Sequence, residues 1–273
     1  MTRYSPWLPA LMYGYLGFML LLPLGALIGQ SGLSTWSAFW RWVTDPVAVA
    51  AYQLTFATAL IAALVNTVLG LVLAWVLVRY EFPGRRWLDS LVDLPLAMPS
   101  VVAAITLATL YGQGGVIGQW WDEGTWLGRW LPLNFTASVQ AVVLAQLFVT
   151  LPFVVRTVQP VLGELEPEVE EAAYTLGASP WWCFWRVILP PLTPALVTGF
   201  TLALARGIGE FGVVVLISGN IPYRTLAATV YIYQQLEEFN YPAATAIALV
   251  LLLVSLALFG LTRWFQGRVL PPL

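Results

Sequence analysis

Long apolar windows alternate with short polar or turn-rich stretches along the whole chain. A helix needs about 20 mostly apolar residues to cross a hydrocarbon layer of about 30 Å. Six windows meet this length, at about residues 8–28, 54–78, 91–110, 137–158, 195–217 and 243–264. The pattern therefore predicts an all-α, polytopic membrane protein with about six transmembrane helices in a single domain, 1–273.

The polar stretch between the fourth and fifth windows, residues 163–190, is predicted to form two short helical pieces outside the bilayer. Pro167 suits the first position of a helix, glutamates follow where the helix dipole favours negative charge, and Gly177 is placed to end the helix. An apolar stripe at three-to-four spacing comprises Leu165, Val169, Ala172, Ala173 and Leu176. The second piece, 180–188, is followed by prolines that begin the fifth window.

The alternative for this stretch is an amphipathic helix that rests on the membrane surface. Such helices usually carry a basic polar face, whereas this one is acidic. The small alanines of the stripe would instead let another protein surface approach closely. We therefore favour a docking helix.

Composition excludes several classes of function. Hydrophobic residues make up 59% of the chain and charged residues 10%, whereas a soluble domain is about a quarter charged. Histidine is absent and Cys183 is the one cysteine, which excludes internal disulfides, thiol-rich metal sites, Ser-His triads and histidine-ligated haem. A net charge of −2 leaves no nucleic-acid footprint. We predict no catalytic, cofactor-binding or metal-binding residue.

The arginines are distributed unevenly between the two sides of the predicted spans. One side carries Arg3, Arg79, Arg85, Arg86, Arg156, Arg186, Arg263 and Arg268, and the other carries Arg41, Arg129 and Arg224. Cytoplasmic loops are enriched in positive charge, so both termini are expected in the cytoplasm. The first window is too long for a signal-peptide core and is expected to be a retained span.

A spaced motif occupies residues 171–190: Glu171-Ala172-Ala173, then Gly177, Val187 and Leu189-Pro190. It resembles the EAA signature of ABC importer permeases, with Val187 where that family usually has isoleucine. The resemblance implies the type I importer permease fold and a coupling helix that docks on a cytoplasmic ATPase subunit. By this resemblance the ATPase-coupling residues are Glu171, Ala172, Ala173, Gly177, Leu189 and Pro190. Because the chain has no lysine, it cannot contain the phosphate-binding loop that ends in Lys-Ser or Lys-Thr, so ATP must be hydrolysed on a partner.

Three further segments resemble sulfate/thiosulfate permeases of the T type, namely 80–86 (YEFPGRR), 93–99 (DLPLAMP) and 235–241 (QLEEFNY). Residues 206–212 and 218–225 resemble both sulfate and molybdate/tungstate permeases, so they identify only the oxyanion group. The resemblance covers nearly the whole chain up to Trp264. It favours sulfate or thiosulfate over molybdate or tungstate and leaves the choice between the first two open.

Arg206 is the one arginine near the middle of a window. A charge there costs on the order of 2.5 to 3.5 kcal/mol on insertion scales, so it should face protein or water. Glu210, one turn on, can pair with it. We favour a structural or gate-stabilising pair over contact with the transported anion, because a fixed cation would hold a divalent anion too firmly for conduction. Asp93 is expected to be a charge at a helix entry.

Glycines cluster around this pair. The expected translocation path or gate comprises Arg206, Gly207, Gly209, Glu210 and Gly212. These glycines would loosen the fifth span. Gly199, Ala203 and Gly207 recur every four residues and permit close helix contact. That contact is either within the subunit or with a second permease.

The resemblance also implies partners: a second permease of the W type, a dimer of cytoplasmic ATPases, an extracytoplasmic sulfate/thiosulfate-binding protein and the lipid of the inner (plasma) membrane. Two other classes of protein stay open. An ion-coupled secondary transporter would use Arg206, Glu210 and Asp93 as coupling charges but would leave residues 163–190 without a function. A non-transporting scaffold would show no anion uptake with any partner.

Overall fold

The computed structural model describes residues 7–32, 35–112, 114–121, 124–130 and 133–269. Arg3 lies outside the described residues, as do the side chains of Arg263 and Arg268. The described residues form helices and turns without a strand, which confirms the expected all-α fold. In chain order the elements are α1 (Trp7–Gly32), α2 (Trp36–Val43), α3 (Pro46–Arg79), α4 (Arg85–Val92), α5 (Leu94–Ala97), α6 (Ser100–Tyr111), η1 (Gly118–Trp121), α7 (Trp126–Trp130), α8 (Val139–Glu164), α9 (Pro167–Thr175), α10 (Pro180–Cys183), η2 (Phe184–Ile188), α11 (Leu189–Ile208), α12 (Val214–Ile217), α13 (Ala228–Glu237) and α14 (Tyr241–Val269).

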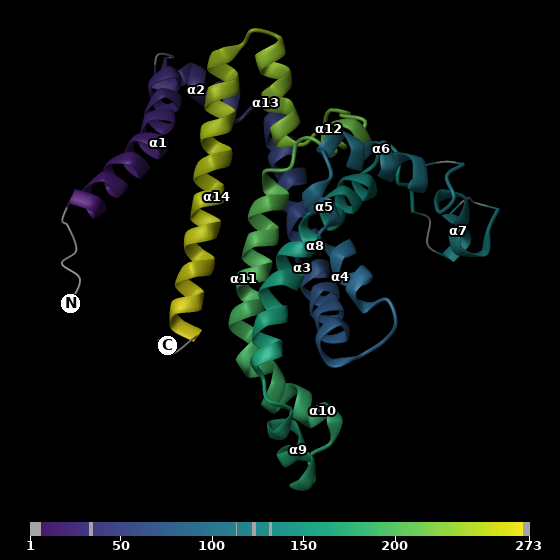
Figure 1. Cartoon of the computed structure of the whole chain (residues 1–273). Helices are drawn as coiled ribbons and strands as arrows, with labels where there is room; N and C mark the ends of the chain where they lie inside the picture. The colour runs from purple at the N-terminus through teal and green to yellow at the C-terminus, as the bar shows by residue number, and fades with distance from the viewer. Residues whose placement is uncertain (1–6, 33–34, 113, 122–123, 131–132, 270–273) are drawn as a thin grey trace.

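Three long helices, α3, α8 and α11, pack together along the centre of the molecule (Figure 1). Val154 of α8 lies between them and touches a glycine on each neighbour. A Cβ atom built on Gly70 of α3 would lie 2.6 Å from Val154 Cγ1, and one on Gly199 of α11 would lie 2.9 Å from Val154 Cα. Because no larger residue fits at either position, the two glycines set how closely the three helices approach.

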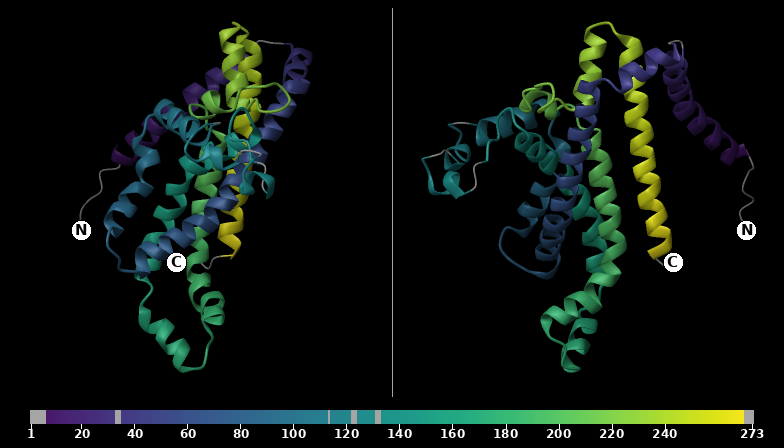
Figure 2. Two further views of the ribbon diagram at one scale, coloured as in Figure 1. Left: turned by 90° about the vertical axis from the view of Figure 1, so that its right-hand side faces the viewer. Right: turned by 180° about the vertical axis from the view of Figure 1, so that it is seen from behind.

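The remaining elements surround this centre. α14 packs beside α13, α1 and α2, and the turn between α13 and α14 lies at the opposite end of the molecule from α9 (Figures 1 and 2). The first residues of α1 and the last residues of α14 point away from that turn. The two ends of the described chain therefore lie toward the side on which α9 projects.

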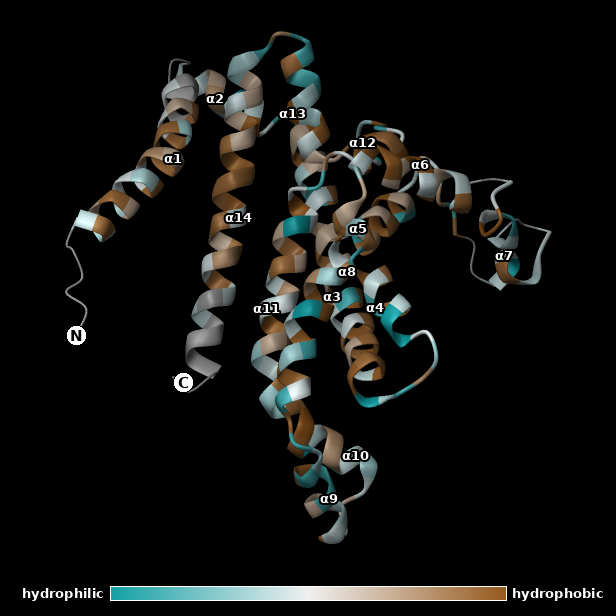
Figure 3. Ribbon diagram, in the orientation of Figure 1, coloured by the Kyte–Doolittle hydropathy of each residue, from teal (hydrophilic) through white to brown (hydrophobic). Residues whose placement is uncertain are grey.

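Five helical stretches are long and apolar enough to cross a membrane, judged by length and composition over the described residues. They are Trp7–Leu27, Pro46–Arg79, Val139–Glu164, Pro180–Ile208 and Tyr241–Thr262. Figure 3 shows hydrophobic residues dominating α3 and the described part of α14. The sixth apolar helix, Ser100–Tyr111, is shorter, at 12 residues.

Two predicted windows do not form single helices. Window 91–110 is divided among the end of α4, α5 and α6, because the residue before a proline avoids the helical conformation and Met98, before Pro99, is extended with ψ 132°. Window 195–217 is interrupted as well, since α11 ends at Ile208 and α12 starts at Val214. Arg206 therefore lies in the last turn of α11 and not in the middle of a span.

Candidate functional site

The 163–190 loop contains the predicted short helix, α9. Pro167 occupies its first turn after the N-cap residue Glu166, and Glu168 and Glu170 follow in that turn. Gly177 has a φ of +87°, which L-residues with a side chain rarely adopt, and its N–H donates to the Tyr174 carbonyl over 3.0 Å. Proline at the start and a left-handed glycine just past the end thus confirm the capping predicted from the sequence.

The second predicted piece of the loop is not a separate helix. α10, η2 and α11 follow one another without a break and form the single stretch Pro180–Ile208. Their junction, Phe184–Ile188, is a π-helical segment. Pro190 and Pro191 come directly after this π-helical segment. The helical stretch continues through them, although the sequence suggested that the prolines would stop the second piece.

α9 is tied to its own subunit by one side. Arg79 Nη2 at the end of α3 lies 2.6 Å from Glu170 Oε1, and both side chains are mostly buried. Ala173 is 8% exposed and belongs to the same buried cluster as Leu77 and Cys183. The glutamate therefore does more than favour the helix dipole, because it fixes α9 against α3.

The other side of α9 is open. Leu176 is 89% exposed and Val169 47% exposed, which is unusual for aliphatic side chains. They line a groove of about 600 Å³ together with Ala172, Gly177 and Trp182. The groove is largely apolar. α9 itself projects from one end of the molecule (Figure 1).

The residues assigned to ATPase coupling divide between these two sides. Glu171, Ala172, Gly177 and Pro190 are exposed, Leu189 is partly buried, and Ala173 is buried. Ala173 thus packs α9 onto its own subunit and also lines the groove. Val169 and Leu176 add exposed apolar surface that the motif alone did not indicate. The coupling role itself stays a prediction.

The predicted ion pair between Arg206 and Glu210 forms at the end of α11. Arg206 Nη1 lies 2.5 Å from Glu210 Oε2, with the Arg206 side chain 38% exposed and that of Glu210 1% exposed. Glu210 Oε1 also accepts from the Val213 N–H over 2.9 Å, at the start of α12. The carboxylate therefore spans the break between α11 and α12 while Arg206 neutralises it.

The nearby glycines lie in different surroundings. A Cβ on Gly207 would lie 3.3 Å from Ala59 Cβ, and one on Gly212 2.5 Å from Ser100 Cβ, whereas Gly209 is exposed. Gln146 Nε2 donates to the Gly207 carbonyl over 3.1 Å. The stripe that includes Gly199 and Gly207 thus packs within the subunit, which answers that open question. The role of these residues in a path or gate stays a prediction.

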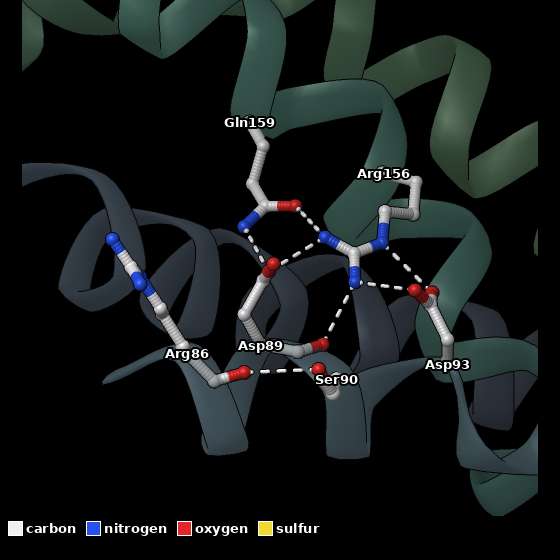
Figure 4. Close-up of polar contacts among 6 residues, drawn as sticks. All are labelled: Arg86, Asp89, Ser90, Asp93, Arg156 and Gln159. Atoms are coloured by element: carbon white, nitrogen blue, oxygen red, sulfur yellow. Dashed lines mark hydrogen bonds and ion pairs between the residues drawn. The ribbon is translucent and has the colours of Figure 1, made fainter. Parts of the chain in front are cut away.

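A second ionic cluster, at Arg156 of α8, was missed by sequence reasoning (Figure 4). Arg156 donates to both carboxylate oxygens of Asp93, over 2.8 and 2.6 Å, and to Oδ1 of Asp89 over 2.6 Å. Gln159 accepts from Arg156 over 2.5 Å and donates to Asp89 over 3.0 Å. Asp93 is the N-cap residue of α5, as expected of a charge at a helix entry, but its side chain makes no cap there and binds Arg156 instead.

This cluster joins α8 to α4 and α5. The two aspartates are 63 and 67 residues from Arg156 in sequence, which is why no local pattern revealed them. The pKa of Asp89 is lowered, first by the hydrogen bond from Gln159 and then by the hydrogen bond from Arg156 and the positive charge of Arg156. Among the described residues no group of three or more His, Cys, Asp and Glu side chains could hold a metal ion.

The chain is similar to a known family of membrane transport proteins. Residues 66–271 match the family described as "Binding-protein-dependent transport system inner membrane component". A probable sulfate transport system permease protein cysT of Nephroselmis olivacea is 51% identical over 97% of this chain and 91% of its own. The sulfate transport system permease protein CysT of Escherichia coli K12 is 46% identical over 92% of this chain and 88% of its own.

Solved structures show the same architecture. A bacterial ABC transporter that imports the polysaccharide alginate matches with a TM-score of 0.77 at 18% identity, covering 98% of this chain and 96% of that one. The MetNI methionine ABC transporter in an inward-facing conformation matches with a TM-score of 0.62 at 16% identity, over 87% and 100% of the two chains. These likenesses confirm the type I importer permease fold. On the strength of the relatives and the matched residues, the chain belongs to the family of binding-protein-dependent transport system inner membrane components and, within it, to the CysT-type permeases.

Proposed function

We propose that this protein is the T-type membrane subunit of an ATP-driven importer for sulfate or thiosulfate. As a permease it is a transport protein and not an enzyme. The observation that carries the proposal is the exposed apolar groove on α9, which lies outside the bundle in a chain that has no nucleotide-binding loop. The near full-length similarity to sulfate permeases supports the anion.

The partners we propose follow from the same resemblance. A W-type permease would complete the pore, two ATPase subunits would bind on the cytoplasmic side, and a sulfate/thiosulfate-binding protein would deliver the anion from outside. Both termini would then lie in the cytoplasm, on the side of α9. Exposed Leu176 and Val169 give this end of α9 an apolar surface that suits contact with the ATPase.

The connections of α9 support a mechanical role. It is joined by short turns to α8 and α10, and the Arg79–Glu170 ion pair ties it to α3. α10 continues through η2 into α11. A displacement of α9 by the ATPase would therefore act on α3, α8 and α11, the three helices that pack together at the centre.

At the far end of α11, we propose that Arg206 and Glu210 stabilise the gate and do not bind the anion. Glu210 already neutralises Arg206 at 2.5 Å, so little positive charge is left to hold a sulfate ion. Gly207 and Gly212 allow the close contacts with α3 and α6 that hold the break in place. Exposed Gly209 gives this break its conformational freedom.

Uptake of radiolabelled sulfate in a strain that lacks this permease tests the proposal. Expression of the chain with its partners should restore uptake, and unlabelled thiosulfate should compete more strongly than molybdate. Uptake that persists in vesicles without ATP would favour the secondary transporter. Stronger competition by molybdate would identify a molybdate or tungstate permease instead.

Two substitutions test the coupling assignment. Glu171→Lys reverses an exposed charge beside the groove and Gly177→Pro cannot adopt a φ of +87°, so both should abolish uptake while the protein still inserts. Glu168→Lys is the matched control, since it reverses an exposed glutamate of the same helix outside the motif. Retained uptake in Glu171→Lys, or equal loss in Glu168→Lys, would count against the assignment.

A further inference from the structure

A second apolar groove lies away from α9, along the last turns of α3. It has a volume of about 620 Å³ and is lined by Leu71, Val72, Trp75, Tyr80, Phe82 and Phe184, among others. The Trp75 and Phe184 rings meet edge to face with their centroids 6.0 Å apart, which joins α3 to η2. Arg79 lies over the Trp75 ring, 5.9 Å from its centroid. These contacts hold the groove open and in place.

A basic hollow adjoins this groove. Its volume is about 390 Å³, and its lining includes Arg85, Arg86 and Trp87. Glu81 and Phe82 line both the hollow and the groove, so the two are adjacent. The apolar groove thus lies next to two arginines, Arg85 and Arg86.

The two arginines are available to a ligand. Within the described part of the chain, no ion pair or side-chain hydrogen bond is formed by Arg85 or Arg86, whereas Arg79 is held by Glu170. They start α4, whose N-cap residue Gly84 supplies no capping side chain, so the positive end of the helix adds to their charge. With Glu81 at the rim, the residues that line the hollow carry one net positive charge. Asp89, whose charge also acts on Arg85, is bound by Arg156.

The position of the site relative to the span completes the argument. The groove lies on residues 71–76 of the span Pro46–Arg79, and the basic hollow lies just past the end of that span. Tyr80 is 57% exposed and Trp87 79% exposed, as is typical of rings at the level of lipid headgroups. A phospholipid has the same arrangement, because its acyl chain lies within the bilayer and its phosphate lies at the headgroup level.

We propose that this site binds one anionic glycerophospholipid that carries a single phosphodiester charge, such as phosphatidylglycerol. An acyl chain occupies the groove on α3, and the phosphate lies between Arg85 and Arg86. The single negative charge of the diester matches the net charge of the site. Basic pockets beside transmembrane helices on the cytoplasmic side bind such headgroups in other proteins.

Native mass spectrometry of the assembled transporter tests this, after equilibration in detergent with equimolar phosphatidylglycerol and phosphatidylcholine. The wild type should retain phosphatidylglycerol preferentially. The variant Arg85→Gln/Arg86→Gln should retain it about tenfold less, as expected for two partly screened cations near the membrane surface. The control Arg129→Gln/Arg224→Gln removes the same charge from exposed positions elsewhere and should change retention by less than about twofold.

A second variant tests the groove. Val72→Trp fills it and should reduce retention of phosphatidylglycerol although both arginines remain. Val68→Trp, at an exposed position one turn earlier that does not line the groove, should not. Equal retention of the two lipids, or equal losses in the two double arginine variants, would overturn the proposal. Loss of assembly in Val72→Trp alone would also overturn it, because the groove would then be a subunit contact.

Discussion

Arg156 and Arg206 are both arginines within apolar helices, yet their surroundings differ. Arg156 is bound by two aspartates and a glutamine, and those carboxylates are 43% and 47% exposed. Arg206 is bound by a single glutamate that is 1% exposed. In the first cluster water can replace a lost partner, whereas in the second it cannot reach the carboxylate.

The two clusters also stabilise different parts of the fold. Arg156 holds α4 and α5 against α8, across more than 60 residues of sequence. Arg206 and Glu210 lie one turn apart, and the pair orders the break between α11 and α12. The first is a tie between helices, and the second stabilises the end of one helix.

The largest effect is expected from Arg206→Ala. It leaves the buried Glu210 carboxylate unpaired, which should cost about 3 kcal/mol of stability. The double variant Arg206→Ala/Glu210→Ala removes the stranded charge and should recover more than half of that loss. The unfolding midpoint of the detergent-solubilised transporter, together with the amount of assembled complex, measures both. Equal losses in the single and double variants would sink the idea of a structural pair.

Arg156→Ala should cost less, about 1 to 2 kcal/mol, because Asp89 and Asp93 can be hydrated once the guanidinium is gone. Arg156→Lys should recover only part of this, since an ammonium cannot bind a carboxylate with two parallel hydrogen bonds. The same unfolding assay applies, with sulfate uptake to report on the position of α4 and α5. A loss as large as that of Arg206→Ala would contradict the comparison.

The contrast also explains what the sequence could reveal. The Arg206–Glu210 pair is a local i, i+4 relation, so it was predictable, and so were the caps of α9 at Pro167 and Gly177. Gln159 is on the same helix as Arg156, but the aspartate partners of Arg156 come from α4 and the start of α5, so they required the fold. Asp93 does lie at a helix start, as predicted, but its bond to Arg156 could not be read from the local sequence.

The positions of helix breaks were also not predictable from the apolar pattern of the sequence. Apolar windows indicate how much chain is buried in lipid or protein but not where a helix breaks. Asp93 is the one charged residue of window 91–110, yet Pro99 and the extended Met98 divide the window. The burial of Ala173, in the same cluster as Leu77 and Cys183, likewise depends on how separate elements pack.

A smaller effect is expected from Glu210→Gln. The amide oxygen can still accept from the Val213 N–H, and the partly exposed Arg206 loses only its ion pair, so the cost should be about 1 kcal/mol. Measured by the same unfolding midpoint, this variant should lie between the wild type and Arg206→Ala. If it were as unstable as Arg206→Ala, the buried charge would not be the cause of that variant's defect.

The smallest effect concerns pH at the Arg156 cluster. The hydrogen bond from Gln159 and the nearby Arg156 hold the pKa of Asp89 below its usual range. A carboxylate with a lowered folded-state pKa stabilises the protein above its unfolded-state pKa of about 4, and this contribution is lost as pH falls through the folded-state value. The contribution should stay below about 1 kcal/mol because the side chain is partly exposed. Asp89→Asn should therefore be less stable than the wild type at pH 7, and the difference should shrink as the pH approaches 3. The control Glu168→Gln changes an exposed acid and should show no such convergence with the wild type. Parallel pH profiles for the wild type and Asp89→Asn would contradict the prediction, because the cluster would then bind the ionised aspartate no more tightly than the neutral amide.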